Sequence, residues 1–143
     1  MYGVKRNTRS RLVQSASAGD KQITVATGLD WKAGDQIGIA PTRIKYEEKD
    51  FAVITAYDSK TGIAKLDRVL SYQHFGAADS TGAKYSGVDL RAEVMLLSRN
   101  VRIVGDPADG WGCQFVTSDF IEGNLEARYG STNLDNVEIY NCS

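Results

Sequence analysis

Residues 87–105 read Gly-Val-Asp-Leu-Arg-Ala-Glu-Val-Met-Leu-Leu-Ser-Arg-Asn-Val-Arg-Ile-Val-Gly, and this stretch decides the fold that we expect. It contains no proline and no internal glycine. Charged and apolar residues alternate from Asp89 to Val94, which is the period-two pattern of a β-strand. Ser98, Arg99 and Asn100 interrupt the apolar run, and residues 101–104 resume it. We therefore predict two short strands joined by a tight polar bend.

Short apolar segments between turns continue on the N-terminal side of this stretch. We expect strands at residues 22–26, 36–40, 51–56 and 63–66, the last two joined as a β-hairpin by a polar turn that ends at Gly62. No segment of useful length has the periodicity of an amphipathic helix. The sequence therefore predicts an all-β protein.

The C-terminal third has a coarser repeat of short strands, each followed by Gly or Asn. We expect short strands at residues 113–116 and 124–129. Residues 101–104, 114–116, 125–129 and 137–140 are each suited to form one face of a successive coil. This is the pattern of a parallel β-solenoid, whose coils bury their apolar face only against neighbouring coils. We expect solenoid coils in this part of the chain, with a further coil due where it stops.

Composition narrows the class of protein. The 143 residues suffice for one domain with its own core, and the formal net charge is −1. This nearly neutral net charge argues against nucleic acid as a partner, because a nucleic-acid-binding protein needs a basic surface. It leaves a polysaccharide or protein ligand open. No apolar run approaches the ~20 residues of a membrane span. The start of the chain lacks a signal peptide, so we expect either a cytosolic protein or a piece of a larger secreted chain.

Asn141, Cys142 and Ser143 form an N-x-S sequon, which favours the secreted alternative and makes Asn141 a candidate glycosylation site. Cys113 and Cys142 are the two cysteines. If bonded, they would close a loop of about 30 residues and add about 3 kcal/mol of stability. In a solenoid they would alternatively be apolar fillers on stacked coils.

His74 is the single histidine, and no cysteine or second histidine lies near it in the sequence. It is a poor metal ligand on its own, and we expect neither a metal nor a cofactor. As a general acid or base it would need a partner that the sequence does not identify, so we expect a histidine hydrogen-bonded at the end of a strand.

Trp31 and Trp111 are the aromatic candidates for stacking on a sugar ring. For Trp31 we place first the alternative that it closes the end of a small barrel. A basic run, Lys5, Arg6, Arg9 and Arg11, is either a patch for an anionic ligand or a solvated edge, and the second reading is the first expectation.

Three blocks of the chain resemble the fibrocystin and fibrocystin-like family, which is related to the cell-migration-inducing, hyaluronan-binding hyaluronidases. They are residues 30–40 (Asp-Trp-Lys-Ala-Gly-Asp-Gln-Ile-Gly-Ile-Ala), residues 70–76 (Leu-Ser-Tyr-Gln-His-Phe-Gly) and residues 88–103. The resemblance implies a fragment of a large extracellular protein that follows a domain named for eight glycines. It also implies a right-handed parallel β-helix with coils from about residue 88 to 143, carrying a small barrel-like insertion at about residues 22–72.

Two positions depart from the family's pattern. Ser10 stands where an aromatic residue is common, which puts an N-terminal packing contact in doubt. Met95 stands where glycine is common, and we read this as a roomier interior at that position, because methionine fills irregular gaps.

Two functions compete, ahead of a weaker third, a cytosolic or phage-type β-solenoid adhesin that would have reduced cysteines and no glycan at Asn141. The first is a non-catalytic extracellular module that is structural or binds a glycan or another ligand. The second is a fragment of an enzyme that degrades hyaluronan or a related polysaccharide, with Asp89, Arg91, Glu93 and His74 as candidate catalytic residues. Glycoside cleavage uses two carboxylates ~5–9 Å apart. Asp89 and Glu93 would lie roughly 13 Å apart on one straight strand. We therefore expect Arg91 to neutralise its neighbours in a partly buried ladder, which favours the non-catalytic module.

Overall fold

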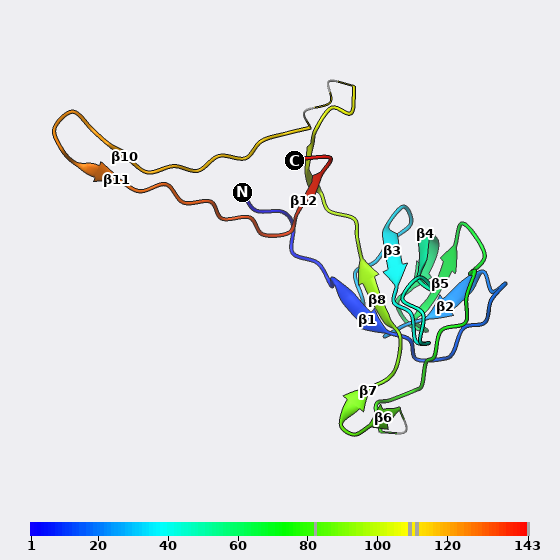
Figure 1. Ribbon diagram of the computed structural model, residues 1–143. Coiled ribbons are helices and arrows are strands. Elements are labelled where there is room, and N and C mark those ends of the chain that lie inside the picture. The colour runs from blue at the N-terminus through cyan, green and yellow to red at the C-terminus, as the bar shows by residue number, and fades with distance from the viewer. Residues whose placement is uncertain (82, 109, 111, 143) are drawn as a thin grey trace. The chain divides into compact units, whose positions relative to one another are not determined.

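The computed structural model describes residues 1–81, 83–108, 110 and 112–142. Over these residues the chain is all-β and contains no helix. The fold forms two compact units (Figure 1). One comprises Arg6–Ser98, and the other combines Met1–Lys5 with Arg99–Ser143.

A six-stranded antiparallel sheet builds the unit Arg6–Ser98. Its strands, in the order β1-β8-β3-β4-β5-β2 across the sheet, are β1 (Arg9–Arg11), β8 (Glu93–Leu96), β3 (Gln36–Ile39), β4 (Asp50–Asp58), β5 (Ile63–Leu66) and β2 (Gln22–Thr24). The strands predicted near residues 22–26, 36–40, 51–56 and 63–66 are confirmed, as is the hairpin of β4 and β5. Figure 1 shows the sheet curled, with β1 and β2 as its two edges.

Alternation along the strands places one apolar set inside the curl. Ile37, Ile54, Leu66 and Val94 come from four different strands and are at most 1 % exposed. Branched aliphatic side chains suit this position because they pack well against their neighbours on a pleated surface. The hydrophobic core of this unit therefore lies inside the curl of a single sheet.

The outer face of the same sheet explains two residues that look out of place. Gly38 lies opposite Met95 on one side and Phe51 on the other, and a Cβ at position 38 would lie 3.1 Å from Cε1 of Phe51. The missing side chain thus leaves room for the Phe51 ring. Met95 is 42 % exposed on this face. The expectation that Met95 marks a roomier interior was wrong, because the residue points away from the core.

The two edges of the sheet meet through a short seam. The Val13 amide donates to Thr24 O (2.9 Å), and the Ala26 amide donates to the hydroxyl of Ser10 (3.1 Å). Ser10 is buried, at 9 % exposure, between the more exposed Arg9 and Arg11. A small hydroxyl therefore satisfies a backbone donor that the ladder does not reach, which an aromatic side chain could not do.

The predicted pair of strands around the polar bend exists, but the two strands do not pair with each other. β8 lies between β1 and β3, whereas β9 (Val101–Val104) pairs in parallel with β12 (Val137–Tyr140). The two units divide between Ser98 and Arg99, within the predicted bend. The bend is thus a junction between units, and β8 belongs to the sheet rather than to the coils expected from residue 88.

Strand predictions for residues 113–116 and 124–129 were largely wrong. Residues 113–116 form no strand, and only β11 (Ala127–Arg128) forms in the second segment, paired antiparallel with β10 (Phe120–Ile121). Leu125 has a φ of +65° and is 86 % exposed in the connecting turn. The alternating apolar pattern of these two segments thus had no neighbouring sheet whose strands the segments could pair with. A further small hairpin joins β6 (Lys84–Tyr85) and β7 (Val88–Asp89).

Two isoleucines give a matched test of the core. Ile54→Ala removes a fully buried side chain and should lower the free energy of unfolding by about 2–5 kcal/mol, because it loses apolar burial and leaves a cavity. Ile44→Ala removes a fully exposed one and should change stability by less than about 0.5 kcal/mol. Chemical denaturation of both variants measures the difference, and equal effects would contradict the inward assignment of Ile54.

Candidate functional site

A polar groove of about 640 Å³ lies along the β1 edge of the sheet. Its walls come from β1, from the segment after β2 and from the residues around the start of β8. The polar side chains that line it are those of Arg9, Ser10, Arg11, Thr27, Thr61, Arg91 and Glu93. Three guanidinium groups thus converge on one groove of the Arg6–Ser98 unit, which makes it the candidate site.

Strand geometry places the groove's central charges. Arg9 and Arg11 alternate with buried Ser10, so both side chains leave the outer face of β1. Glu93 lies opposite Arg11 in the register of β1 and β8. Its Oε1 lies 3.5 Å from Nη1 of Arg9, and its Oε2 lies 3.8 Å from Nη2 of Arg11. One carboxylate therefore serves two arginines.

Arg11 has a second, shorter contact. Its Nη1 donates to the backbone oxygen of Arg91 at 2.7 Å, which fixes the guanidinium in the groove independently of Glu93. Arg9 has no comparable anchor among the described contacts, and its side chain is 77 % exposed. The groove thus combines the Arg11 guanidinium, held by a backbone oxygen, with the largely exposed guanidinium of Arg9.

Asp89 and Arg91 form a separate, tight ion pair with an Nη2–Oδ2 distance of 2.8 Å. Hydrogen bonds from the Arg91 side chain outweigh the small effect of burial and lower the pKa of Asp89 to about 2. A carboxyl with this pKa is ionised at neutral pH and cannot serve as a general acid. Asp89 is held as a structural anion.

The predicted ladder of Asp89, Arg91 and Glu93 forms only in part. Arg91 neutralises Asp89 as expected, but Glu93 contacts Arg9 and Arg11 instead. The reason is that the strand is interrupted: Asp89 ends β7, Glu93 begins β8, and the residues between them leave the ladder. The two carboxylates therefore do not share one face of a continuous strand.

His74 is fully buried and hydrogen-bonded through both ring nitrogens. Nδ1 lies 3.0 Å from the Ala40 oxygen, and Nε2 lies 2.9 Å from Oδ2 of Asp50. Its backbone also forms a β-bridge with Ala16. This arrangement agrees with the expected strand-end histidine, and it leaves neither ring nitrogen free to meet a substrate.

Asp50 organises the segment that carries His74. Its carboxylate accepts hydrogen bonds from the amides of Ser71 and Tyr72 at 3.0–3.1 Å in addition to the contact with His74. Burial acts to raise the pKa of Asp50, but the hydrogen bonds from His74, Ser71 and Tyr72 outweigh it and hold the pKa below its usual value. No sequence pattern indicated this pairing, because 24 residues separate the partners.

The basic run near the N-terminus divides into different roles. Arg6 forms a bidentate pair with buried Asp35, with both N–O distances 2.8 Å. Desolvation acts to raise the pKa of Asp35, yet hydrogen bonds from Arg6 and from the Lys32 amide lower it overall. Arg6 is thus a structural cation, Lys5 is exposed, and only Arg9 and Arg11 line the groove.

Trp31 lies in the core and is 4 % exposed. Its indole N–H donates to the Asn7 oxygen at 2.6 Å, and its ring tilts against Tyr57 at a centroid distance of 6.2 Å. This burial fits the packing role that was expected first, and the ring offers no free face to a sugar. Trp111, the other aromatic candidate, lies outside the described residues.

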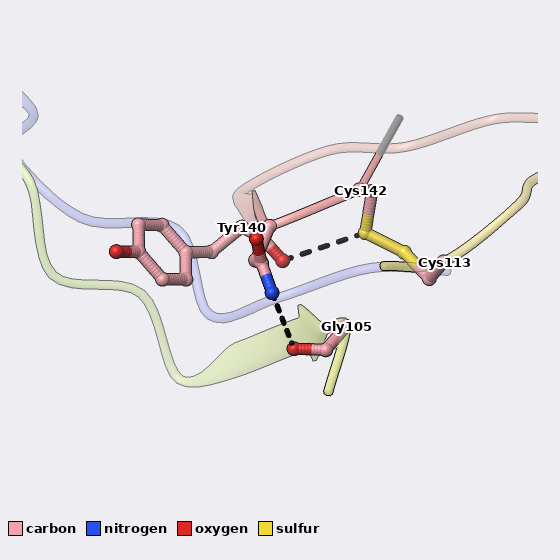
Figure 2. Close-up of a disulfide and its surroundings, with 5 residues drawn as sticks. Gly105, Cys113, Tyr140 and Cys142 are labelled. Atoms are coloured by element: carbon pink, nitrogen blue, oxygen red, sulfur yellow. Dashed lines mark hydrogen bonds between the residues drawn. A yellow bond between two sulfur atoms is a disulfide. The ribbon is translucent and has the colours of Figure 1, made fainter. Parts of the chain in front are cut away.

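Cys113 and Cys142 are joined in a disulfide with a Cα–Cα distance of 4.3 Å (Figure 2). Asn141 precedes Cys142, and its Nδ2 donates to the Gly105 oxygen at 3.1 Å. Asn141 follows β12 and is exposed, whereas its Nδ2, the atom that would carry a glycan, is engaged in this hydrogen bond; Ser143 of the sequon lies outside the described residues.

The described part of the chain holds no group of three or more His, Cys, Asp or Glu residues arranged to bind a metal ion. It also holds no helix with the length and hydropathy needed to cross a membrane.

Comparison with known proteins identifies the family. The chain is 30 % identical to human Fibrocystin-L over 149 residues that include 98 % of this chain. It belongs to the fibrocystin-like family. It is also 30 % identical to a human cell surface hyaluronidase over 91 % of the chain, and 30 % identical to the human cell migration-inducing and hyaluronan-binding protein over 76 % of it.

This fibrocystin-like chain corresponds to a small part of each relative. It spans 3 % of the length of human Fibrocystin-L, 10 % of the hyaluronidase and 8 % of the hyaluronan-binding protein. No family model matches the chain.

Replacing Asp50 tests the buried pair. Asp50→Asn should lower the free energy of unfolding at neutral pH by about 1–3 kcal/mol, because His74 loses a charged acceptor. The depressed pKa means that Asp50 contributes stability above about pH 4 and loses it as pH falls through its folded value. Thermal unfolding from pH 7 to pH 2 should therefore show the gap between the two proteins closing below pH 4. A gap that stays constant would contradict this role; Glu47→Gln is the control.

Reducing the disulfide should loosen the unit that contains it. Each of the buried apolar side chains found in the described residues belongs to Arg6–Ser98, so the other unit relies on strand pairing and on this bond. A Cys113→Ser, Cys142→Ser variant should be cut by trypsin after Arg128, while cleavage within residues 22–66 stays as slow as in the oxidised protein. Equal protection of Arg128 in both proteins would show that the bond is dispensable.

Proposed function

We propose that this chain is a non-catalytic extracellular module of a longer fibrocystin-like protein, and that its groove binds an acidic glycan. The observation that carries the proposal is the charge of the groove. Arg9, Arg11 and Arg91 face two carboxylates, Glu93 and Asp89, which leaves one positive charge without a full partner. Guanidinium groups recognise carboxylates through paired, charge-assisted hydrogen bonds.

The chemistry of the candidate acids supports a non-catalytic role. A glycosidase of the common type needs one carboxyl that holds a proton near neutral pH and a second that is free to act on the sugar or on water. Asp89 is ionised and bound to Arg91, Glu93 is shared by two arginines, and His74 is buried. Each candidate already has a partner within the fold.

We also propose that the chain joins a barrel-like part to parallel β-helix coils of the parent protein. The strands β2 to β5, which fall within residues 22–72, form part of the curled sheet and support a barrel-like part, and the parallel pair of β9 and β12 supports adjacent coils. The right-handed helix and its further coils follow from the resemblance. An extracellular location agrees with the disulfide and with the candidate glycan at Asn141.

The second candidate is a fragment of a polysaccharide-degrading enzyme. It is favoured by one observation: a human relative and a zebrafish relative are each named cell surface hyaluronidase. In this reading the present chain would supply groups to a reaction centre completed elsewhere in the parent protein.

Incubating the chain with high-molecular-weight hyaluronan separates these functions. Size-exclusion chromatography with light scattering should show protein eluting with polymer of unchanged mass. An Arg9→Gln, Arg11→Gln variant should bind at least about tenfold more weakly, because it loses the charge-assisted contacts. Arg43→Gln with Lys45→Gln removes the same charge from a loop outside the groove and should bind normally.

The other outcomes are equally informative. A fall in polymer mass would support the enzyme, and protein eluting apart from an intact polymer would leave a structural module without this ligand.

A further inference from the structure

We propose that Glu93 determines the specificity of the groove by occupying, in the free protein, the place of the ligand's carboxylate. This inference rests on the proposed glycan-binding function. It assigns to Glu93 the role of an internal competitor that an acidic ligand must displace, rather than that of a catalytic acid or a purely structural anion.

The first support is the looseness of the Glu93 contacts. Its oxygens lie 3.5 and 3.8 Å from Arg9 and Arg11, whereas charge-assisted hydrogen bonds have lengths of about 2.7–2.9 Å. By contrast, Arg91, which also lines the groove, lies 2.8 Å from Oδ2 of Asp89. Glu93 therefore satisfies the charge of the two arginines without satisfying their directional donors, and a better-placed carboxylate can replace it.

The second support is that Arg11 does not depend on Glu93 for its position. Nη1 of Arg11 stays bound to the Arg91 oxygen at 2.7 Å. Displacing Glu93 thus leaves the Arg11 guanidinium in the groove, with the largely exposed Arg9 side chain beside it. The displaced side chain is 28 % exposed and can turn toward water.

Competition with an internal carboxylate selects the class of ligand. A single carboxylate gains little, because it exchanges one anion for another. A linear chain that carries carboxylates at regular intervals presents several at once, so its effective concentration at the groove is high. The groove should therefore prefer long acidic glycans and take up isolated uronic acids poorly.

The experiment compares three variants with the wild-type chain, using a hyaluronan oligosaccharide of defined length as the probe. Isothermal titration calorimetry at low salt should show Glu93→Gln binding about two- to fivefold more tightly than wild type, the range expected for removing a partly exposed ion pair. Glu93→Asp keeps the net charge but withdraws the carboxylate by one methylene, and should also bind more tightly. Glu47→Gln removes one negative charge outside the groove and should bind as wild type does.

The outcomes separate failure of this inference from failure of the proposed function. If wild type binds and neither Glu93 variant binds more tightly, while melting temperatures show that all are folded, Glu93 is no competitor. If Glu47→Gln gains as much as Glu93→Gln, the gain is a general effect of charge and the inference fails. If no variant and no wild type binds, the glycan-binding function fails and the inference with it.

Discussion

The seam between the two edges of the curled sheet, made by hydrogen bonds from the Val13 amide to Thr24 O and from the Ala26 amide to the buried Ser10 hydroxyl, lies beside the groove and positions its first wall. Curling brings β1 and β2 toward each other, but their ladders do not merge at this point. By fixing Ser10 inward, the bond from the Ala26 amide also turns Arg9 and Arg11 outward, so the core and the charged groove arise from the same three residues.

Much of the sheet could be predicted because local pattern and tertiary context agree there. The segments that became β2, β3, β4 and β5 have β-branched residues, clear turns and a core to face. The same pattern failed at residues 113–116 and 124–129, because alternation makes a strand only where another strand supplies hydrogen bonds and a buried face. Short period-two segments are thus necessary for a sheet but do not establish one.

The candidate site was less predictable than the fold, because its parts are distant in the sequence. Arg11 and Glu93 meet only through the pairing of β1 with β8, and Asp50 meets His74 across a separation of 24 residues. The basic run indicated charge near the N-terminus but not that Arg6 would bind buried Asp35 while Arg9 and Arg11 would face a groove. Which charged side chains pair with one another, and which face the groove, depends on the register of the sheet. Residue types alone do not reveal that register.

The disulfide closes a segment with a sequence separation of 29 residues whose two ends lie at the parallel pair β9 and β12. Because the ends are fixed together, the length of what lies between them matters little to stability: doubling a flexible loop costs only about 0.6 kcal/mol. The hairpin of β10 and β11 therefore occupies a place where evolution can lengthen, shorten or exchange sequence at small thermodynamic cost. The surface of this unit can therefore vary here while β9 and β12 keep their register.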